Sequence, residues 1–104
     1  MTLSLLYTTF PSKDTAVKVV SALLDKRLLA CANILGPVTS VYRWEEKIKA
    51  SEEVAVLLKT TTEKASNLVE DLKNLHPYET PAILWLPVEK ALPTFAAWVS
   101  ESVS

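Results

Sequence analysis

Two long extended segments joined by a two-residue turn dominate this sequence. Residues 30–44 and 47–60 are rich in β-branched and aromatic side chains, which are typical of strands, and Glu45-Glu46 lies between them. The first segment alone would reach about 50 Å if it were straight. A compact chain of this length has a diameter of roughly 33 Å. The hairpin must therefore project from its domain, or bend at Gly36-Pro37, which holds the only glycine.

The side chains of this hairpin predict an oligomer. A two-residue turn pairs Tyr42 with Lys49 and places Val41 and Ile48 on the opposite face, so the projecting part is apolar on both faces. An isolated hairpin of this kind is marginal in water, and its open edges invite pairing. We expect each hairpin to lie on a neighbouring copy in a closed symmetric ring. The alternative is that it folds back on its own domain.

The first half of the remaining chain alternates strand and helix. Alternating apolar residues predict a strand over residues 3–9, and apolar residues at helical spacing predict a helix over 12–27 with Ser12 as its N-cap. Thr60-x-x-Glu63 has the form of a capping box and predicts the start of a second helix. His76-Pro77 ends that helix, because a residue before proline is pushed out of the helical region.

The last third of the chain completes the fold. Residues 82–88 predict a fourth strand that is apolar on both faces and therefore central or covered. Pro93 opens a last helix. The order β-α-β-β-α-β-α predicts an α+β fold, a ferredoxin-like βαββαβ sandwich with an extended central hairpin and an extra C-terminal helix. We expect residues 1–104 to form this single domain.

Charge and composition exclude several classes of protein. Eleven Lys and Arg against twelve Asp and Glu give a net charge of −1, so we expect no nucleic-acid partner. A single cysteine forms no disulfide within the chain. No leader segment is recognisable, and no apolar run approaches the ~20 residues that a bilayer requires, so we expect a cytoplasmic protein without a membrane partner.

One short segment carries most of the candidate chemistry. Two prolines fix the backbone of His76-Pro77-Tyr78-Glu79-Thr80-Pro81, and His76 is the only histidine. Imidazole suits copper and zinc, and Glu79 could add an oxygen ligand or orient the ring. The alternative is that His76 bonds the last carbonyls of its helix and Glu79 caps a turn. Because a closed zinc site requires four ligands, a strong site would need Cys31, another subunit or water, and we expect weak metal binding.

Four further residues each have a structural and a functional interpretation. Cys31 is either a small buried apolar residue or a soft ligand for copper. Lys59 either extends its stem to the sheet end or binds an anion in a cleft between subunits, paired with Glu79. Trp44 and Tyr78 either serve packing or stack on a ligand.

The sequence carries five recognisable motifs, which are residues 30–34 (ACANI), 38–44 (VTSVYRW), 58–60 (LKT), 76–81 (HPYETP) and Trp98. Together they resemble those of the CutA divalent-cation tolerance proteins. The resemblance covers almost the whole chain and implies a ferredoxin-like fold, a homotrimer, and a role in tolerance to copper and other divalent metals, without a known enzymatic reaction. Glu46 departs from the glycine usual in the family's hairpin turn, and Gly36-Pro37 departs from the usual Pro-Gly.

Two functions follow as hypotheses. The first is a trimeric cytoplasmic protein of divalent-cation (copper) tolerance that requires no cofactor and binds Cu(II) or another divalent metal weakly through His76, with Cys31 and Glu79 as helpers. The second is a trimeric small-anion or partner-binding signalling or scaffold protein, with Lys59, Tyr78 and Trp44 in clefts between subunits. We expect no enzyme, since the chain lacks CxxC, a glycine-rich phosphate loop and HExxH.

Overall fold

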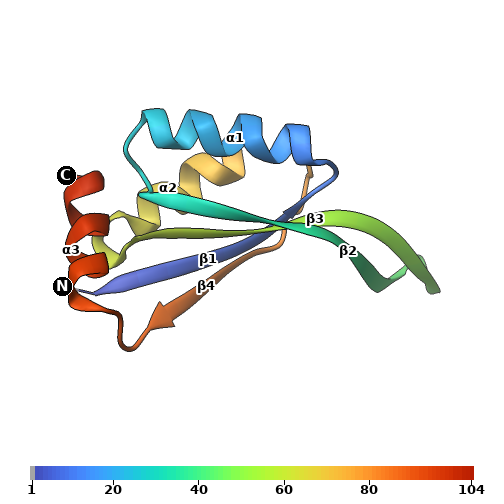
Figure 1. Ribbon diagram of the computed structural model, residues 1–104. Helices are drawn as coiled ribbons and strands as arrows, with labels where there is room; N and C mark the ends of the chain where they lie inside the picture. The colour runs from blue at the N-terminus through green and yellow to red at the C-terminus, as the bar shows by residue number, and fades with distance from the viewer. Residues whose placement is uncertain (1) are drawn as a thin grey trace.

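The computed structural model describes residues 2–104 and has the predicted order of elements. The helices α1 and α2 lie on one side of the sheet, and α3 lies at the end of the sheet beside the N-terminus (Figure 1). The α+β, ferredoxin-like architecture is therefore confirmed. The elements are β1 (Leu3–Phe10), α1 (Lys13–Asp25), β2 (Cys31–Trp44), β3 (Lys47–Thr61), α2 (Thr62–Leu75), β4 (Ile83–Val88) and α3 (Pro93–Ser102).

The four strands form one antiparallel sheet in the order β2-β3-β1-β4. The expectation that residues 82–88 form a central strand, or one covered within the chain, is wrong. β3 occupies one side of β1, so β4 pairs with the other side and lies at the sheet edge. Leu84, Trp85 and Leu86 are exposed there. Apolar residues on both faces therefore do not identify a central strand in this chain.

The core lies between the helices and the sheet face that they cover. Apolar side chains of β1 and β3 meet one stripe from each helix, as the alternating and helical spacings predicted. Burial of one such leucine stabilises the fold by about 1.5–3 kcal/mol. Fully buried members of this core include Leu6, Phe10, Val56, Leu58, Leu23, Leu68 and Leu72. The opposite sheet face has no helix over most of its length.

Capping side chains set where the two covering helices begin. Ser12 is the N-cap of α1, as predicted. The predicted capping box at Thr60 is wrong by one residue, because β3 continues to Thr61 and Thr61 accepts the N–H of Lys64 (3.3 Å). The hydroxyl of Thr60 is buried instead and donates to the carbonyl of Leu28 (2.8 Å).

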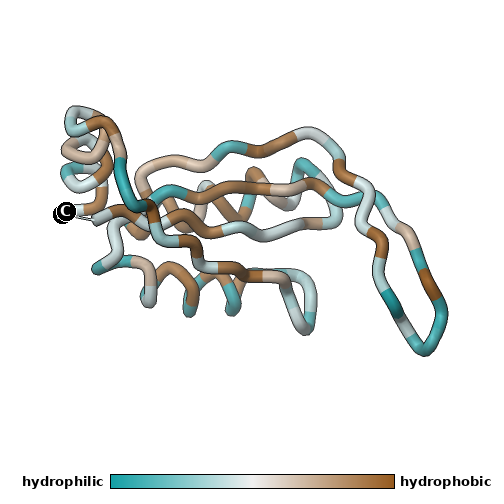
Figure 2. The backbone as a smooth tube through the Cα atoms, turned by 90° about the horizontal axis from the view of Figure 1, so that it is seen from below, coloured by the Kyte–Doolittle hydropathy of each residue, from teal (hydrophilic) through white to brown (hydrophobic). Residues whose placement is uncertain are grey.

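The long hairpin both bends and projects. The pairing register of β2 shifts between Ile34 and Pro37, which confirms the predicted irregularity at Gly36-Pro37. β1 ends at the pair Phe10–Val54, so residues 38–53, which we call the arm, extend beyond it. The molecule measures 45 × 26 × 22 Å, and the arm leaves the body of the domain (Figure 2).

The turn at the tip of the arm uses two glutamates in the left-handed region. Glu45 has φ 49° and Glu46 has φ 66°, which is the pattern of a type I′ turn. The predicted pairing of Tyr42 with Lys49 is present. A side chain in the left-handed region costs about 1–2 kcal/mol relative to glycine, so this turn is strained.

Candidate functional site

The segment between α2 and β4, residues 76–82, crosses the end of β1 and the base of the arm. We call this segment the strap. His76 ends α2 in an extended conformation (φ −70°, ψ 136°), because Pro77 follows it. The strap carries three of the six side chains that the sequence singled out: His76, Tyr78 and Glu79.

His76 fastens the strap to β1. Its side chain is only 8% exposed, and Nε2 lies 2.9 Å from the carbonyl oxygen of Thr9 and 3.1 Å from the hydroxyl of Thr8. Nδ1 accepts the N–H of Tyr78 (3.2 Å), so Nε2 carries the hydrogen and donates to Thr9. The ring also stacks on Phe10, with centroids 4.5 Å apart. The alternative interpretation is therefore wrong about the partner, because the ring bonds β1 rather than the last carbonyls of α2.

Tyr78 fastens the strap to the base of the arm. Its hydroxyl donates to Glu53 Oε2 (2.7 Å), and its ring is tilted against the ring of His76 at 5.0 Å. Burial and the Glu53 carboxylate raise the pKa of Tyr78 to about 12. The phenol therefore stays protonated at neutral pH and remains a donor.

Glu53 and His76 have shifted titrations for different reasons. Burial lowers the pKa of His76, and this outweighs the opposite effects of the Thr9 carbonyl and of Glu53. Burial alone would raise the pKa of Glu53, but hydrogen bonds from the side chains of Ser40, Tyr78 and Thr9 lower it. At neutral pH the site accordingly holds a neutral imidazole next to an ionised carboxylate.

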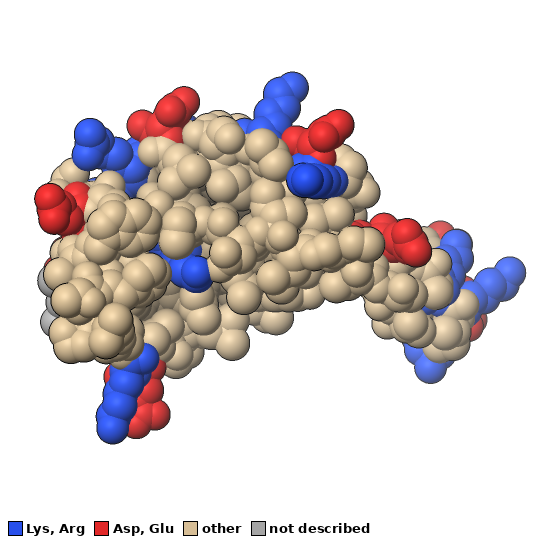
Figure 3. Space-filling view, viewed as in Figure 1, with Lys and Arg blue, Asp and Glu red and all other residues tan. Residues whose placement is uncertain are grey.

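A groove of about 950 Å³ separates the strap from one face of the arm. It brings together three of the predicted residues, Trp44, Tyr78 and Glu79. The space-filling view shows charged groups on the arm and over the helices, with a largely uncharged surface between them (Figure 3). The side chains that define the groove are Tyr42, Trp44, Lys49, Glu53, Tyr78 and Glu79.

Cys31 and Lys59 lie elsewhere. They face each other across β2 and β3, and since their neighbour Leu58 belongs to the core, they occupy the sheet face away from α1 and α2. Cys31 is half-buried, and Lys59 Nζ lies 5.8 Å from the centroid of the Phe95 ring in α3. One chain therefore does not bring Cys31 to His76, which lies on the helix side of the sheet.

The donor set of one chain does not build a closed metal site. Both ring nitrogens of His76 are hydrogen-bonded, and within residues 2–104 no three His, Cys, Asp or Glu side chains gather. The pairing of Lys59 with Glu79 is also absent from a single chain. Over the same residues, the one ion pair joins Lys26 to Asp71 (2.9 Å), which connects α1 to α2.

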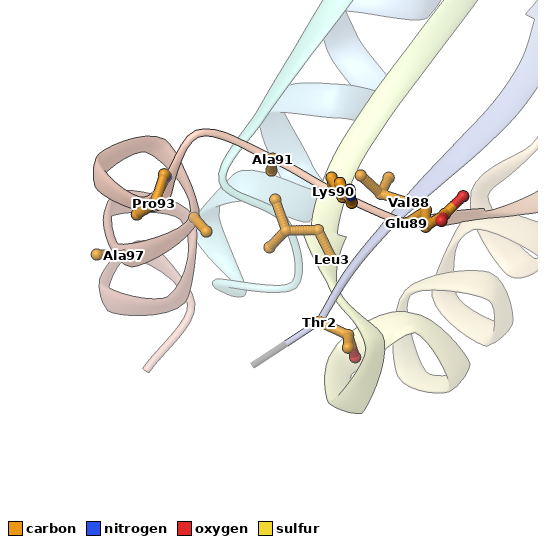
Figure 4. Close-up of a pocket in the computed structure, with 9 residues that line it drawn as sticks. Thr2, Leu3, Val88, Glu89, Lys90, Ala91, Pro93 and Ala97 are labelled. Carbon is orange, nitrogen blue, oxygen red and sulfur yellow. The ribbon is translucent and has the colours of Figure 1, made fainter.

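A second hollow, of about 500 Å³, lies between the start of β1 and the turn into α3 (Figure 4). Small and aliphatic side chains such as Leu3, Val88 and Ala97 line much of it, together with Glu89 and Lys90. None of the six predicted residues contributes to it, so the candidate chemistry lies at the strap.

Glu53 is the functional residue that the sequence did not reveal. In the sequence, Glu53 is one of several hairpin residues whose charges alternate in sign, and such residues usually form a solvated surface. Its position is what could have indicated a role. Val54 is the β3 residue at the end of the pairing with β1, so Glu53 is the first residue beyond that pairing, where the arm begins. A carboxylate at the base of a projecting hairpin is placed to meet the strap.

Comparison with known proteins identifies the family. Residues 4–102 match the sequence profile described as CutA1 divalent ion tolerance protein. The chain belongs to the CutA family. A CutA relative from Thermotoga maritima, named divalent-cation tolerance protein, is 46% identical over 95% of this chain and 97% of its own length. Within residues 2–104 of this CutA chain, no helix is long and apolar enough to cross a membrane.

Solved CutA structures have the same fold. The CutA1 structure from Ehrlichia chaffeensis superposes with a TM-score of 0.96 at 39% identity and covers 98% of this chain and 95% of its own. The structure from Archaeoglobus fulgidus, described as a periplasmic divalent cation tolerance protein, gives 0.93 at 38% identity and covers 98% and 99%. The resemblance seen in the sequence motifs is confirmed.

Proposed function

We propose that this chain acts in cellular tolerance to divalent cations, copper among them, as a cytoplasmic homotrimer that binds the ions weakly and catalyses no reaction. The observation that carries the proposal is the match over 95% of the chain to a relative named divalent-cation tolerance protein. The fold alone does not decide how such a role is performed, so the chemistry has to be argued from the residues of the site.

Weak binding is what the strap supports. His76 can coordinate an ion only by giving up the bond of Nδ1 to Tyr78 or that of Nε2 to Thr9. Loss of one such buried bond costs about 1–3 kcal/mol, which weakens an intrinsic affinity roughly 5- to 150-fold. Glu79 is exposed three residues along the strap and could supply an oxygen ligand, with water completing the coordination. In this proposal copper binds reversibly and is not a resident cofactor. Cys31 could act as a ligand only if it came from another subunit.

Calorimetric titration with Cu(II) tests this part of the proposal. The native protein should show saturable weak binding, and His76→Ala should weaken it. Because His76→Ala removes a structural contact, Glu79→Gln provides a second variant at an exposed position, with Glu89→Gln in the other hollow as its matched control. Absence of saturable binding to the native protein would contradict metal binding, and unchanged binding in both strap variants would remove these ligands from it.

The biological role needs a test in cells. Deletion of the gene should reduce growth on copper-containing medium, and expression of this chain should restore it. Fractionation of the same cells should place the protein with cytoplasmic markers. Growth that does not depend on the gene at any copper concentration would contradict the tolerance role.

The exposed apolar surface supports the trimer. Val41 is 67% and Ile48 68% exposed on one arm face, and Leu84 and Leu86 are exposed on the edge strand β4. An arm without a covering partner would be marginal in water. In a closed ring each copy would cover the apolar surface of the next, without an open edge for further growth.

A specific observation keeps the second function open. Lys59 is a half-buried cation beside Phe95 of α3, on the sheet face away from α1 and α2, where a neighbouring copy could complete a cleft around it. We propose as the second candidate that such clefts bind a small anion or a partner protein. A thermal-shift screen of metabolic anions should then give a hit that Lys59→Gln abolishes and that chelators leave unchanged. A hit that chelators abolish would favour the metal role instead.

A further inference from the structure

The groove between the arm and the strap contains aromatic rings without a ring partner in the chain. Tyr42 is 40% and Trp44 57% exposed, and both lie on the arm face that also carries Lys49 and Glu53. Across residues 2–104, ring-to-ring contacts involve neither of these two side chains. Two large amphipathic rings therefore line a concave surface of about 950 Å³, a size typical of small-molecule sites.

A third aromatic ring, that of Tyr78, lines the strap side of the groove and is held in a fixed position. Tyr78 is held by its hydroxyl on Glu53 and by its backbone N–H on His76, so its ring has a defined position on the strap side of the groove. The phenol of Tyr42 is the smallest of the influences that raise the pKa of Tyr78. The groove thus has aromatic side chains on both of its walls.

The charges of the groove are complementary to a cation. Two carboxylates, of Glu53 and Glu79, line it against the single ammonium of Lys49. The faces of aromatic rings carry partial negative charge and attract cations, most strongly when those cations are weakly hydrated. A quaternary ammonium group, in which every position on the nitrogen carries carbon, meets this requirement because it has no N–H donor that must stay in water.

We propose that this groove binds a small organic cation with a methylated ammonium head, placed against the rings of Tyr42, Trp44 and Tyr78 and neutralised by Glu79 and Glu53. The activity differs from metal binding because a methylated ammonium accepts no coordination from nitrogen or oxygen lone pairs. It is also compatible with a trimer, because Ile48, which is 68% exposed, lies on the opposite face of the arm and does not line the groove.

Choline is the probe, and 3,3-dimethylbutan-1-ol is its neutral counterpart of the same shape. Choline should shift the indole N–H resonance of Trp44 in a saturable manner and leave those of Trp85 and Trp98 unchanged. The neutral alcohol should bind at least about threefold more weakly, since it lacks the attraction between charge and ring. Both titrations use the native protein at one fixed protein concentration.

Matched variants locate the site. Glu79→Gln should weaken choline binding about two- to fivefold, the effect of one partly exposed carboxylate. Glu52→Gln removes the same charge from the opposite arm face and should change nothing. Trp44→Leu should weaken choline binding more than alcohol binding. Equal affinity for the alcohol, or no saturable change at about 50 mM choline, would overturn the proposal, and neither result would bear on Cu(II) binding.

Discussion

Replacement of His76 by alanine should destabilise the protein far more than its place at a helix end suggests. The substitution removes a ring that stacks on Phe10 at 4.5 Å, a contact that contributes about 0.5–1.5 kcal/mol beyond burial. It also leaves the Thr9 carbonyl and the Tyr78 N–H without their partner, each at about 1 kcal/mol or more. With the cavity that remains, we expect a loss of about 3 kcal/mol in the free energy of unfolding.

Urea unfolding followed by tryptophan fluorescence measures this loss, at one protein concentration because assembly contributes to apparent stability. Asn74→Ala is the matched control, since Asn74 is exposed on the last turn of the same helix and should cost less than about 0.5 kcal/mol. If His76→Ala were as mild as Asn74→Ala, the role of His76 as the fastening of the strap would be refuted.

Three further predictions concern the same region and the turn of the arm. Burial lowers the pKa of His76 below 6.5, so the unfolded chain binds more protons than the folded one as the solution is acidified. The free energy of unfolding should therefore fall as the pH drops below about 6.5. This dependence should be smaller in His76→Gln, and an identical pH profile of the two proteins would contradict the prediction. Tyr78→Phe should raise the pKa of Glu53, visible in its carboxyl NMR titration, because a hydrogen bond to the ionised form is lost; no change would mean that the bond is absent in solution. Glu46→Gly should stabilise the protein by about 0.5–1 kcal/mol in urea unfolding, since glycine adopts φ 66° without a steric penalty, and a loss of stability would contradict the strained turn.

The elements were predictable because local signals agree with the fold. Ser12 caps a helix of regular amphipathic spacing, and the two-residue turn fixes the pairing of Tyr42 with Lys49. β4 could not be placed, because apolar residues on both faces do not distinguish a central strand from the exposed edge strand that β4 forms. The capping box placed the start of α2 one residue too early. Thr60 and Thr61 are equally suited to be the N-cap, and only the pairing of β3 with β1 decides between them.

The site was predictable only in part. Two prolines on either side of residues 78–80, directly after a lone histidine, indicated a fixed segment, and that segment is the strap. The partners of His76 lie 67 and 68 residues away on β1, so no local pattern could reveal them. Cys31 lies on the sheet face opposite to His76, because it pairs with Lys59 and shares that residue's face. This pairing depends on the register shift at Gly36-Pro37, which the sequence does not define.

The molecular mass in dilute solution tests most directly whether other copies of the chain cover the exposed arm. Size-exclusion chromatography with multi-angle light scattering should give three times the 11.5 kDa of one chain, unchanged on dilution through the micromolar range. A stable species of 11.5 kDa with a soluble, folded arm would contradict the account.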